Sequence, residues 1–364
     1  FMRVGVDGEV GTEDRLREGS GGVSLPVRNR QGCCSATDAA DARFVAGMLG
    51  VPFYVLNFKE DFERIIDYFA DEYVNGRTPN PCIVCNRQLK FGKLAAYAEA
   101  AGIHYIATGH YARIEGDEGG SEMDPPVLRR AIDDRKDQSY VLFELDRAVL
   151  GRTLFPIGGL TKDEVRNEAR RFGLPICDKP DSVEICFVPD RDYARVVRER
   201  RPEAFREGDV VDQDGRTLGR HAGIGHFTVG QRRGLGIAAG VPLYVTHVDV
   251  ATNTVAVGGK ANLLKQEMAI RRINLLRSGV PRKFRADVKI RYLHRAAPAT
   301  VELDGGAREG VGLGAHVVFD EPQSALTPGQ AAVFYDGDVV IGGGWIAGGV
   351  DRSGVRESEG VEVA

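Results

Sequence analysis

The chain has 364 residues, 43% of them hydrophobic and 27% charged, with a formal net charge of −4 and six cysteines. The length predicts two or three domains, and the cysteines are too few to staple a secreted fold. No run of about 18 apolar residues occurs and no basic segment precedes an apolar one at the start, so the sequence predicts a cytoplasmic protein without a membrane span.

The first half of the chain alternates between strand and helix patterns. Residues 51–58 form an apolar, strand-like run. The next segment carries apolar residues on one helical face: Phe62, Ile65, Ile66, Phe69 and Tyr73. A helix over 89–101 precedes a strand over 104–108, and Thr161 with Glu164 predicts a capping-box helix start. This alternation predicts a parallel α/β sheet whose ligands bind at the carboxyl ends of the strands.

From about residue 205 the pattern changes to short strands separated by Gly, Asp and Asn. It predicts two small β-rich, barrel-like units that divide near residue 268, with a hairpin turn at Asp336-Gly337. Beyond Gly348 the segment is acidic and has no apolar period, which predicts a mobile tail. We expect four parts in order: an α/β domain over 1–204, a central β domain over 205–268, a C-terminal β-barrel over 269–347 and a tail over 348–364.

The overall charge hides a basic segment in the second half of the chain. Residues 271–295 contain nine basic side chains and one acid, a local charge of +8, so the other residues sum to −12. Further basic runs lie at 191–201 and 230–234. A single basic run is as often a solvated surface as it is a binding site for nucleic acid. Three runs in the same half of the chain favour contact with phosphate groups.

Two cysteines three positions apart, Cys82 and Cys85, are the first candidates for chemistry. Pro79 and Pro81 predict an extended or turning backbone, and a helix is expected from Asn86, which would place Cys85 near a helix N-terminus. There the helix dipole favours a thiolate, the reactive form of cysteine. By itself the pair is compatible with metal binding, redox exchange or nucleophilic catalysis.

Other candidates lie further along the chain. Cys186 falls in a Pro- and Asp-rich loop, an unusual place for a buried structural cysteine, although a structural role stays open. Gly109 would let a nucleotide approach the backbone and His110 could bond a base or phosphate, with core or cap roles equally compatible. Residues 135–140 offer a cation, an anion and an amide in succession.

Taken together, these segments resemble the bacterial tRNA-specific 2-thiouridylases in order and spacing over about residues 32 to 347. The longest matches are NGRTPNPCIVCNRQLKFG at 75–92, DKPDSVEICFVPD at 178–190 and TPGQAAVFYDGDVVIGGGWI at 327–346. The resemblance implies a parallel-sheet ATP pyrophosphatase domain, of the adenine nucleotide alpha-hydrolase-like kind, followed by two small β-rich, barrel-like domains.

The resemblance also implies an ATP-dependent sulfurtransferase that acts on tRNA. ATP, with Mg²⁺, would adenylate the C2 oxygen of the wobble uridine, and a persulfide sulfur from a donor protein would replace it. By motif position Cys85 is the nucleophilic thiol and Cys186 receives the persulfide, which implies either a transient Cys85–Cys186 disulfide or release of hydrogen sulfide. The expected molecule is a monomer in the cytoplasm.

Further residues are assigned by their match to the family's motifs. Gly109 and the segment Ser20, Gly21 and Gly22 correspond to ATP-binding positions. The uridine must leave the anticodon stack to reach the thiols, and a larger set corresponds to positions near the tRNA or its target base. This set is Asn80, Pro81, Cys82, His110, Lys136, Asp137, Gln138, Arg291, Tyr292 and Gln330.

Departures from the family pattern leave two alternatives open. Cys82 stands where many relatives carry Asp, an acid that can serve as general base, and Cys82, Cys85 and Cys186 could together hold an iron–sulfur cluster. The segment Ser20–Ser24 is similar to the phosphate-binding SGGVDSS motif but lacks its Asp-Ser-Ser, so residues 1–32 are expected to form an incomplete ATP site. The alternatives are a catalytically impaired tRNA-binding relative and an iron–sulfur-dependent thiolase.

Overall fold

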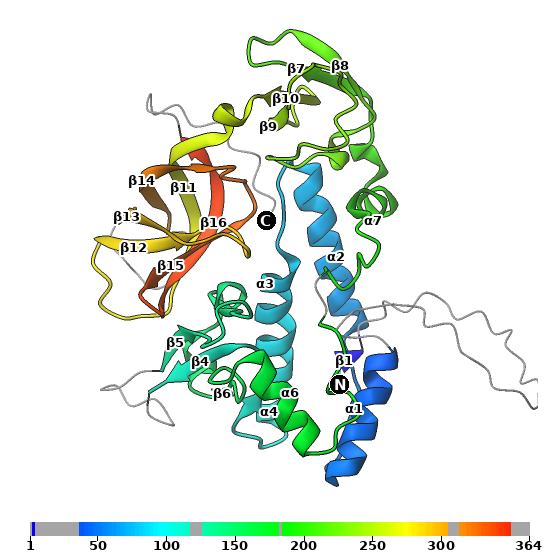
Figure 1. The fold of residues 1–364 in the computed structure, drawn as a ribbon, viewed down its shortest axis with the longest axis vertical. Helices are drawn as coiled ribbons and strands as arrows, with labels where there is room; N and C mark the ends of the chain where they lie inside the picture. The colour runs from blue at the N-terminus through cyan, green and yellow to red at the C-terminus, as the bar shows by residue number, and fades with distance from the viewer. Residues whose placement is uncertain (1, 4–35, 117–125, 182–183, 305–312, 351–364) are drawn as a thin grey trace, which may run out of the picture.

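The computed structural model describes residues 2–3, 36–116, 126–181, 184–304 and 313–350. The predictions for Ser20, Gly21, Gly22 and the tail beyond 350 lie outside these residues. Figure 1 shows the helical first domain, a small β unit beyond α2 and a barrel beside α3. Within the described ranges, no helix combines the length and apolarity that a membrane crossing requires.

The first domain surrounds two short parallel strand pairs with helices. β1 (Met2–Arg3) pairs with β2 (Leu56–Asn57), and β3 (Ile106–Ala107) pairs with β6 (Thr153–Leu154). The helices are α1 (Ala36–Leu49), α2 (Lys59–Val74), α3 (Pro81–Cys85), the π-helix η1 (Asn86–Lys93), α4 (Leu94–Ala100), α5 (Arg147–Leu150), α6 (Lys162–Arg171) and α7 (Tyr193–Arg200), with the 3-10 helices η2 (Ser139–Leu142) and η3 (Pro202–Ala204). The predicted α/β class is confirmed.

Two local predictions for helices are confirmed in detail. Every apolar residue expected on one face of α2 is buried. The rings of Phe62 and Phe69 are arranged edge to face with the ring of Phe187, with ring centroids 5.8 and 5.1 Å apart. The helix α6 begins with the predicted capping box, in which Glu164 N donates to Thr161 Oγ1 at 3.3 Å and the Glu164 carboxylate accepts from Thr161 N at 2.7 Å.

The helix that carries the paired cysteines begins earlier than expected. The elements α3, η1 and α4 continue into one another from Pro81, because proline at the first helical position needs no hydrogen-bond partner for its nitrogen. The expectation that Cys85 lies near a helix N-terminus from Asn86 is therefore wrong. It is Cys82 that lies in the first turn, where the exposed N–H groups and the dipole act.

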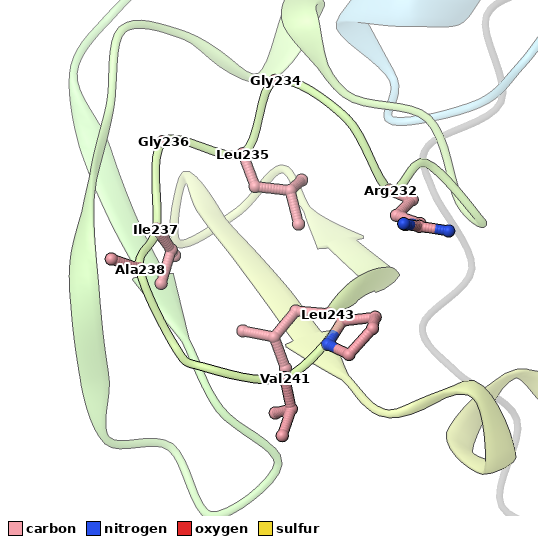
Figure 2. Close-up of a pocket in the computed structure, with 9 residues that line it drawn as sticks. Arg232, Gly234, Leu235, Gly236, Ile237, Ala238, Val241 and Leu243 are labelled. Carbon is pink, nitrogen blue, oxygen red and sulfur yellow. The ribbon is translucent and has the colours of Figure 1, made fainter.

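A central β unit follows the first domain. Its sheet has the order β8-β7-β10-β9, made by β7 (Gly208–Val211), β8 (Thr217–His221), β9 (Tyr244–Asp249) and β10 (Thr254–Gly258), with η4 (Ile224–His226) and η5 (Lys260–Leu263) beside it. The loop over 232–243 borders a hollow of about 480 Å³. Leu235 and Leu243 lie on the inner side of this loop (Figure 2). None of the predicted site residues lines this hollow.

The last part is a closed six-stranded barrel. Its order is β11-β14-β13-β12-β15-β16, and β16 pairs back onto β11 to close the ring. The strands are β11 (Leu264–Leu275), β12 (Lys283–Lys289), β13 (Ala297–Leu303), β14 (Ala315–Ser324), β15 (Ala331–Asp336) and β16 (Val339–Val350). The predicted barrel and its Asp336-Gly337 turn are confirmed, with Gly337 at φ 60°. β11 runs without a break across residue 268.

One hydrophobic core crosses from the first domain into the barrel. The hairpin of β4 (Ala112–Glu115) and β5 (Val127–Arg130) extends the barrel sheet, since Arg129 pairs with Val339. Tyr140, Phe143 and Trp345 are buried in the same cluster. The first domain and the barrel therefore share an interior, which fixes the elements that meet at their junction.

We expect Phe187→Ala to lower the free energy of unfolding by about 3–5 kcal/mol, because the lost ring leaves a cavity between Phe62 and Phe69. Phe172→Ala is the matched control, since that ring is 59% exposed, and it should change stability by about 0.5 kcal/mol or less. Denaturant unfolding followed by circular dichroism measures both. Equal losses in the two variants would contradict this packing.

Candidate active site

The segment before α3 is fastened to the barrel by backbone and amide hydrogen bonds. Thr78 N donates to Pro328 O at 2.8 Å. The side-chain amide of Gln330 donates through Nε2 to Thr78 O at 2.9 Å and to Pro79 O at 3.2 Å. Gln330, which the sequence predicted near tRNA, therefore holds the turn that leads into the cysteine helix.

Gly329 allows the two backbones to come this close. Its φ is +86°, and a Cβ at this position would lie 2.9 Å from Arg77 Cβ and 3.0 Å from Thr78 N. On the other side of the contact, Arg77 is held by Glu72, with Nε and Nη2 donating to the carboxylate at 2.8 and 2.5 Å. Glycine is required here both by its backbone angle and by the space.

A cavity of about 730 Å³ opens at this junction. Its walls come from α2, the turn before α3, the loop around 184–194, the central unit and the barrel. Six of the residues predicted from the sequence line it together: Asn80, Pro81, Cys82, Gln138, Tyr292 and Gln330. Residues more than 200 positions apart in the chain thus meet in one hollow large enough for a nucleoside.

The two predicted catalytic cysteines pack against one hydrophobic cluster beside this cavity. Cys85 and Cys186 are both partly buried and both contact the cluster that contains Phe69 and Phe187. Neither lines the cavity, but Cys82 lies one helical turn before Cys85 and Ile185 directly precedes Cys186, and both of these neighbours do line it. Both cysteines therefore pack on the same cluster and lie close in the chain to residues that line the cavity.

An ion-pair network fixes the start of the loop that carries Cys186. Asp181 accepts from Lys136 Nζ at 2.6 Å and from Lys162 Nζ at 2.7 Å. The two ammonium groups hold the pKa of the Asp181 carboxyl below its ordinary value, against the opposing effect of burial. Lys136, predicted to contact tRNA, is in this structure bound by Asp181, five residues before Cys186.

Three other predicted residues do not reach the cavity. His110 is buried between the rings of Phe91 and Phe155, with Nδ1 2.7 Å from Thr108 Oγ1. Asp137 is buried and accepts from Ala131 N, Ser139 N and Ser139 Oγ. Gly109 lies apart at the carboxyl end of β3 and is exposed. Their predicted contacts with tRNA or nucleotide stay predictions.

The cavity also has polar walls that the sequence did not single out. Glu184, Arg191, Tyr193, His226 and Gln231 line it. Glu184 lies in the quoted match at 178–190, Arg191 and Tyr193 lie in the basic run at 191–201 and Gln231 lies in the run at 230–234, and these were the available signals. Arg191 has φ +62°, a strained conformation for arginine, and strained residues gather at functional sites.

Two tyrosines on the walls keep their phenol protons at neutral pH. Burial raises the pKa of Tyr73 to about 12, partly offset by its hydrogen bond with Thr228. Burial also raises the pKa of Tyr292, and the nearby Asp137 and Cys82 add to the effect. Both phenols can therefore donate hydrogen bonds to a carbonyl oxygen in the cavity.

The basic runs differ in how they are used. Along α7, Arg200 pairs with Glu63 and Asp67, and Arg201 pairs with Asp71 at 2.6 Å, so these cations hold α7 on α2. The contact with phosphates that this run predicts stays a prediction. In the barrel, Arg285 pairs with Asp320 across exposed strand faces, and such pairs are weak enough for a phosphate to compete.

No group of three or more His, Cys, Asp or Glu side chains with metal-binding geometry exists in the part of the chain that the structure describes. Cys82, Cys85 and Cys186 all belong to that part. Cys82 lies on the cavity wall, whereas the other two pack on the hydrophobic cluster. The arrangement therefore gives no support to the iron–sulfur alternative.

Three family models match successive parts of the chain, and they define a protein with one α/β domain and two β units. They are the tRNA methyl transferase HUP domain over residues 23–190, the tRNA methyl transferase PRC-barrel domain over 195–259 and the aminomethyltransferase beta-barrel domain over 265–346.

Curated relatives narrow this class. The tRNA-specific 2-thiouridylase MnmA of Carboxydothermus hydrogenoformans is 47% identical over 317 residues, which covers 86% of this chain and 84% of the relative. The proteins of that description from Solibacter usitatus and Geobacter metallireducens are 46% and 49% identical, and they cover 95% and 86% of this chain and 97% and 83% of their own. The chain belongs to the family of tRNA-specific 2-thiouridylases, as its motifs predicted.

We expect Cys85 and Cys186 to form a disulfide under mild oxidation when all other cysteines are replaced by serine, because both pack on one cluster. The control retains Cys85 and Cys177 instead, since Cys177 does not belong to that cluster. Mass spectrometry of non-reduced peptides measures the cross-link. Equal cross-linking in the two chains would contradict the convergence of Cys85 and Cys186.

Proposed function

We propose that this chain is an ATP-dependent sulfurtransferase that converts the wobble uridine of tRNA to 2-thiouridine. The observation that carries the proposal is the cavity shared by Asn80, Cys82, Gln138 and Tyr292, with Cys85 and Cys186 packed beside it. The names of the curated relatives support the same reaction. The family models carry the words methyl transferase, but two cysteines beside a nucleoside-sized cavity favour sulfur chemistry.

Activation of the uridine comes first. The C2 oxygen attacks the α-phosphorus of ATP and releases pyrophosphate, while the N3 proton passes to a base. A carbonyl oxygen leaves poorly, whereas AMP leaves well, so this step makes C2 open to substitution. Tyr73 and Tyr292 line the cavity as protonated phenols that can orient the base through its carbonyl oxygens.

Sulfur transfer follows with a balanced exchange of bonds. The terminal sulfur of a persulfide on Cys186 attacks C2, and the C–O bond to AMP breaks. The Cys85 thiolate then attacks the Cys186 Sγ, which breaks the sulfur–sulfur bond and leaves the sulfur on the base as the thiocarbonyl. The base regains its N3 proton. A Cys85–Cys186 disulfide remains, and a two-electron reductant must restore both thiols.

ATP would bind at the carboxyl end of the parallel strands. Gly109 follows β3 there, and a Cβ at this glycine would meet only Ile157 Cδ1, at 3.9 Å, so the backbone is open to a nucleotide. ATP supplies the leaving group of the reaction, and Mg²⁺ is proposed to accompany its phosphates. The predicted contacts of Ser20, Gly21 and Gly22 belong to the same proposal.

The proposal includes tRNA as the substrate and a persulfide-carrying protein as the sulfur donor. The exposed cations of the barrel, among them Arg285, would contact the phosphates. A monomer that acts in the cytoplasm is expected from the family resemblance. The order of the three parts, with boundaries near 204 and 268, is likewise proposed.

The test incubates the full chain with unmodified tRNA, ATP, Mg²⁺ and a persulfide donor, and measures 2-thiouridine and AMP. We expect thiolation by the unaltered chain and by Cys177→Ser, the matched control, but none by Cys85→Ser or Cys186→Ser. Pyrophosphate, measured alongside, should still be released by Cys186→Ser, since activation of the uridine precedes sulfur transfer, whereas AMP should not, because it leaves only when sulfur attacks C2.

Two results would contradict the proposal. Full thiolation by Cys186→Ser would remove this residue from the sulfur path. Binding of tRNA by the unaltered chain that weakens with salt, without either product, would instead establish the alternative of a catalytically impaired tRNA-binding relative.

A further inference from the structure

The connection between β12 and β13 contains a tight turn that is bound to the barrel. His294 N donates to Arg291 O at 3.0 Å, which closes a turn with Tyr292 and Leu293 at its centre. Arg291 Nη1 donates to Ser324 O at 3.1 Å and ties the turn to the end of β14. The turn is therefore anchored to the barrel rather than projecting without support.

Tyr292 is fixed on the cavity wall. Its ring centroid lies 6.3 Å from that of Tyr140, and Lys289 Nζ lies 5.7 Å from both centroids. Tyr140 is fully buried, and its hydroxyl donates to Ala331 O at 2.9 Å. Contacts with the tilted ring of Tyr140 and with Lys289 thus hold one central residue of the turn at the cavity that is proposed to receive the uridine.

Leu293 is 92% exposed, the largest exposed fraction of any large hydrophobic side chain among the described residues. The centre of a turn favours Gly, Asn, Asp or Ser, and this leucine adds nothing to the core. Single exposed leucines are common elsewhere, but this one directly follows a cavity-lining tyrosine and lies between Arg291 and Arg295. Places where a local rule is broken are often functional.

We propose that Leu293 is a positioning residue that enters the anticodon loop and fills the stacking place left by the extruded uridine. Taking a base out of its stack costs a few kcal/mol, and an apolar side chain inserted there recovers part of that cost. Tyr292 then faces the base in the cavity. Arg291 and Arg295 lie on either side of the inserted Leu293 side chain, called the wedge, and contact phosphates. This proposal rests on the proposed function.

The test compares Leu293→Ala with Leu218→Ala, a control leucine that is 40% exposed on β8 in the central unit. The tRNA carries 2-aminopurine next to the wobble uridine, because the fluorescence of this base rises when it loses a stacked neighbour. We expect the rise on binding to be largely lost in Leu293→Ala, kcat/KM for thiolation to fall about tenfold, and Leu293→Met to restore both.

Affinity for tRNA at several salt concentrations separates the wedge from electrostatic contacts. Leu293→Ala should leave the slope of log Kd against log salt unchanged, since no phosphate contact is removed. If Leu293→Ala and Leu218→Ala give the same fluorescence rise and the same kcat/KM, the wedge is overturned while the thiolation activity of the unaltered chain still stands. If the unaltered chain does not thiolate, the proposed function fails. The difference in 2-aminopurine fluorescence between Leu293→Ala and Leu218→Ala then decides by itself whether Leu293 acts as the wedge.

Discussion

The contact between the turn before α3 and the start of β15 is the constraint on which the site depends. The Gln330 amide accommodates two consecutive carbonyls, of Thr78 and Pro79, at the point where Gly329 lets the backbones meet. This contact sets the start of the cysteine helix against the barrel. Without it, Cys82 from one domain and Tyr292 from another would have no reason to face the same cavity.

Some cations hold elements of the first domain together through ion pairs, whereas others lie on exposed faces of the barrel. Acidic residues of α2 neutralise Arg200 and Arg201 and hold α7 in place, which also positions the loop that precedes α7 and carries Cys186. Asp181 binds Lys136 and Lys162 at the other end of that loop. Ion pairs thus hold Asp181 before Cys186 and α7 after it, whereas Arg285 of the barrel lies on an exposed face.

Packing explains how chemistry and recognition are joined. Phe187 seats the Cys186 loop on α2, and Tyr140 carries the shared core up to the ring of Tyr292. Burial of these aromatic groups stabilises both domains and orients neighbouring residues toward the cavity. A small change in the packing of either cluster would therefore shift the residues that line the cavity where the base is proposed to lie.

Local periodicity was sufficient for much of the fold. The apolar face of α2, the capping box of α6 and the turn at Asp336-Gly337 depend on neighbours in sequence and were predicted. Long-range pairing was not, because nothing near Arg129 indicates that its strand joins the barrel at Val339. The strand β11 was missed since its charged residues interrupt the apolar alternation.

In the candidate site, too, the sequence predicted some features and not the long-range contacts. Motif matches predicted which residues gather, and six of them do line one cavity. The matches did not indicate what holds each side chain: Lys136 is bound by Asp181, and the Gln330 amide is taken by backbone carbonyls. The start of the cysteine helix was placed too late because a proline can either end a helix or begin one.

The most direct test of the account is photo-cross-linking with tRNA that carries 4-thiouridine at the wobble position, followed by peptide mapping. We expect label in the peptides that contain residues 78–85 and 290–294, and loss of that label when unmodified tRNA competes. Label confined to the loop over 232–243, or to other surfaces away from the junction, would contradict the claim that this cavity receives the target base.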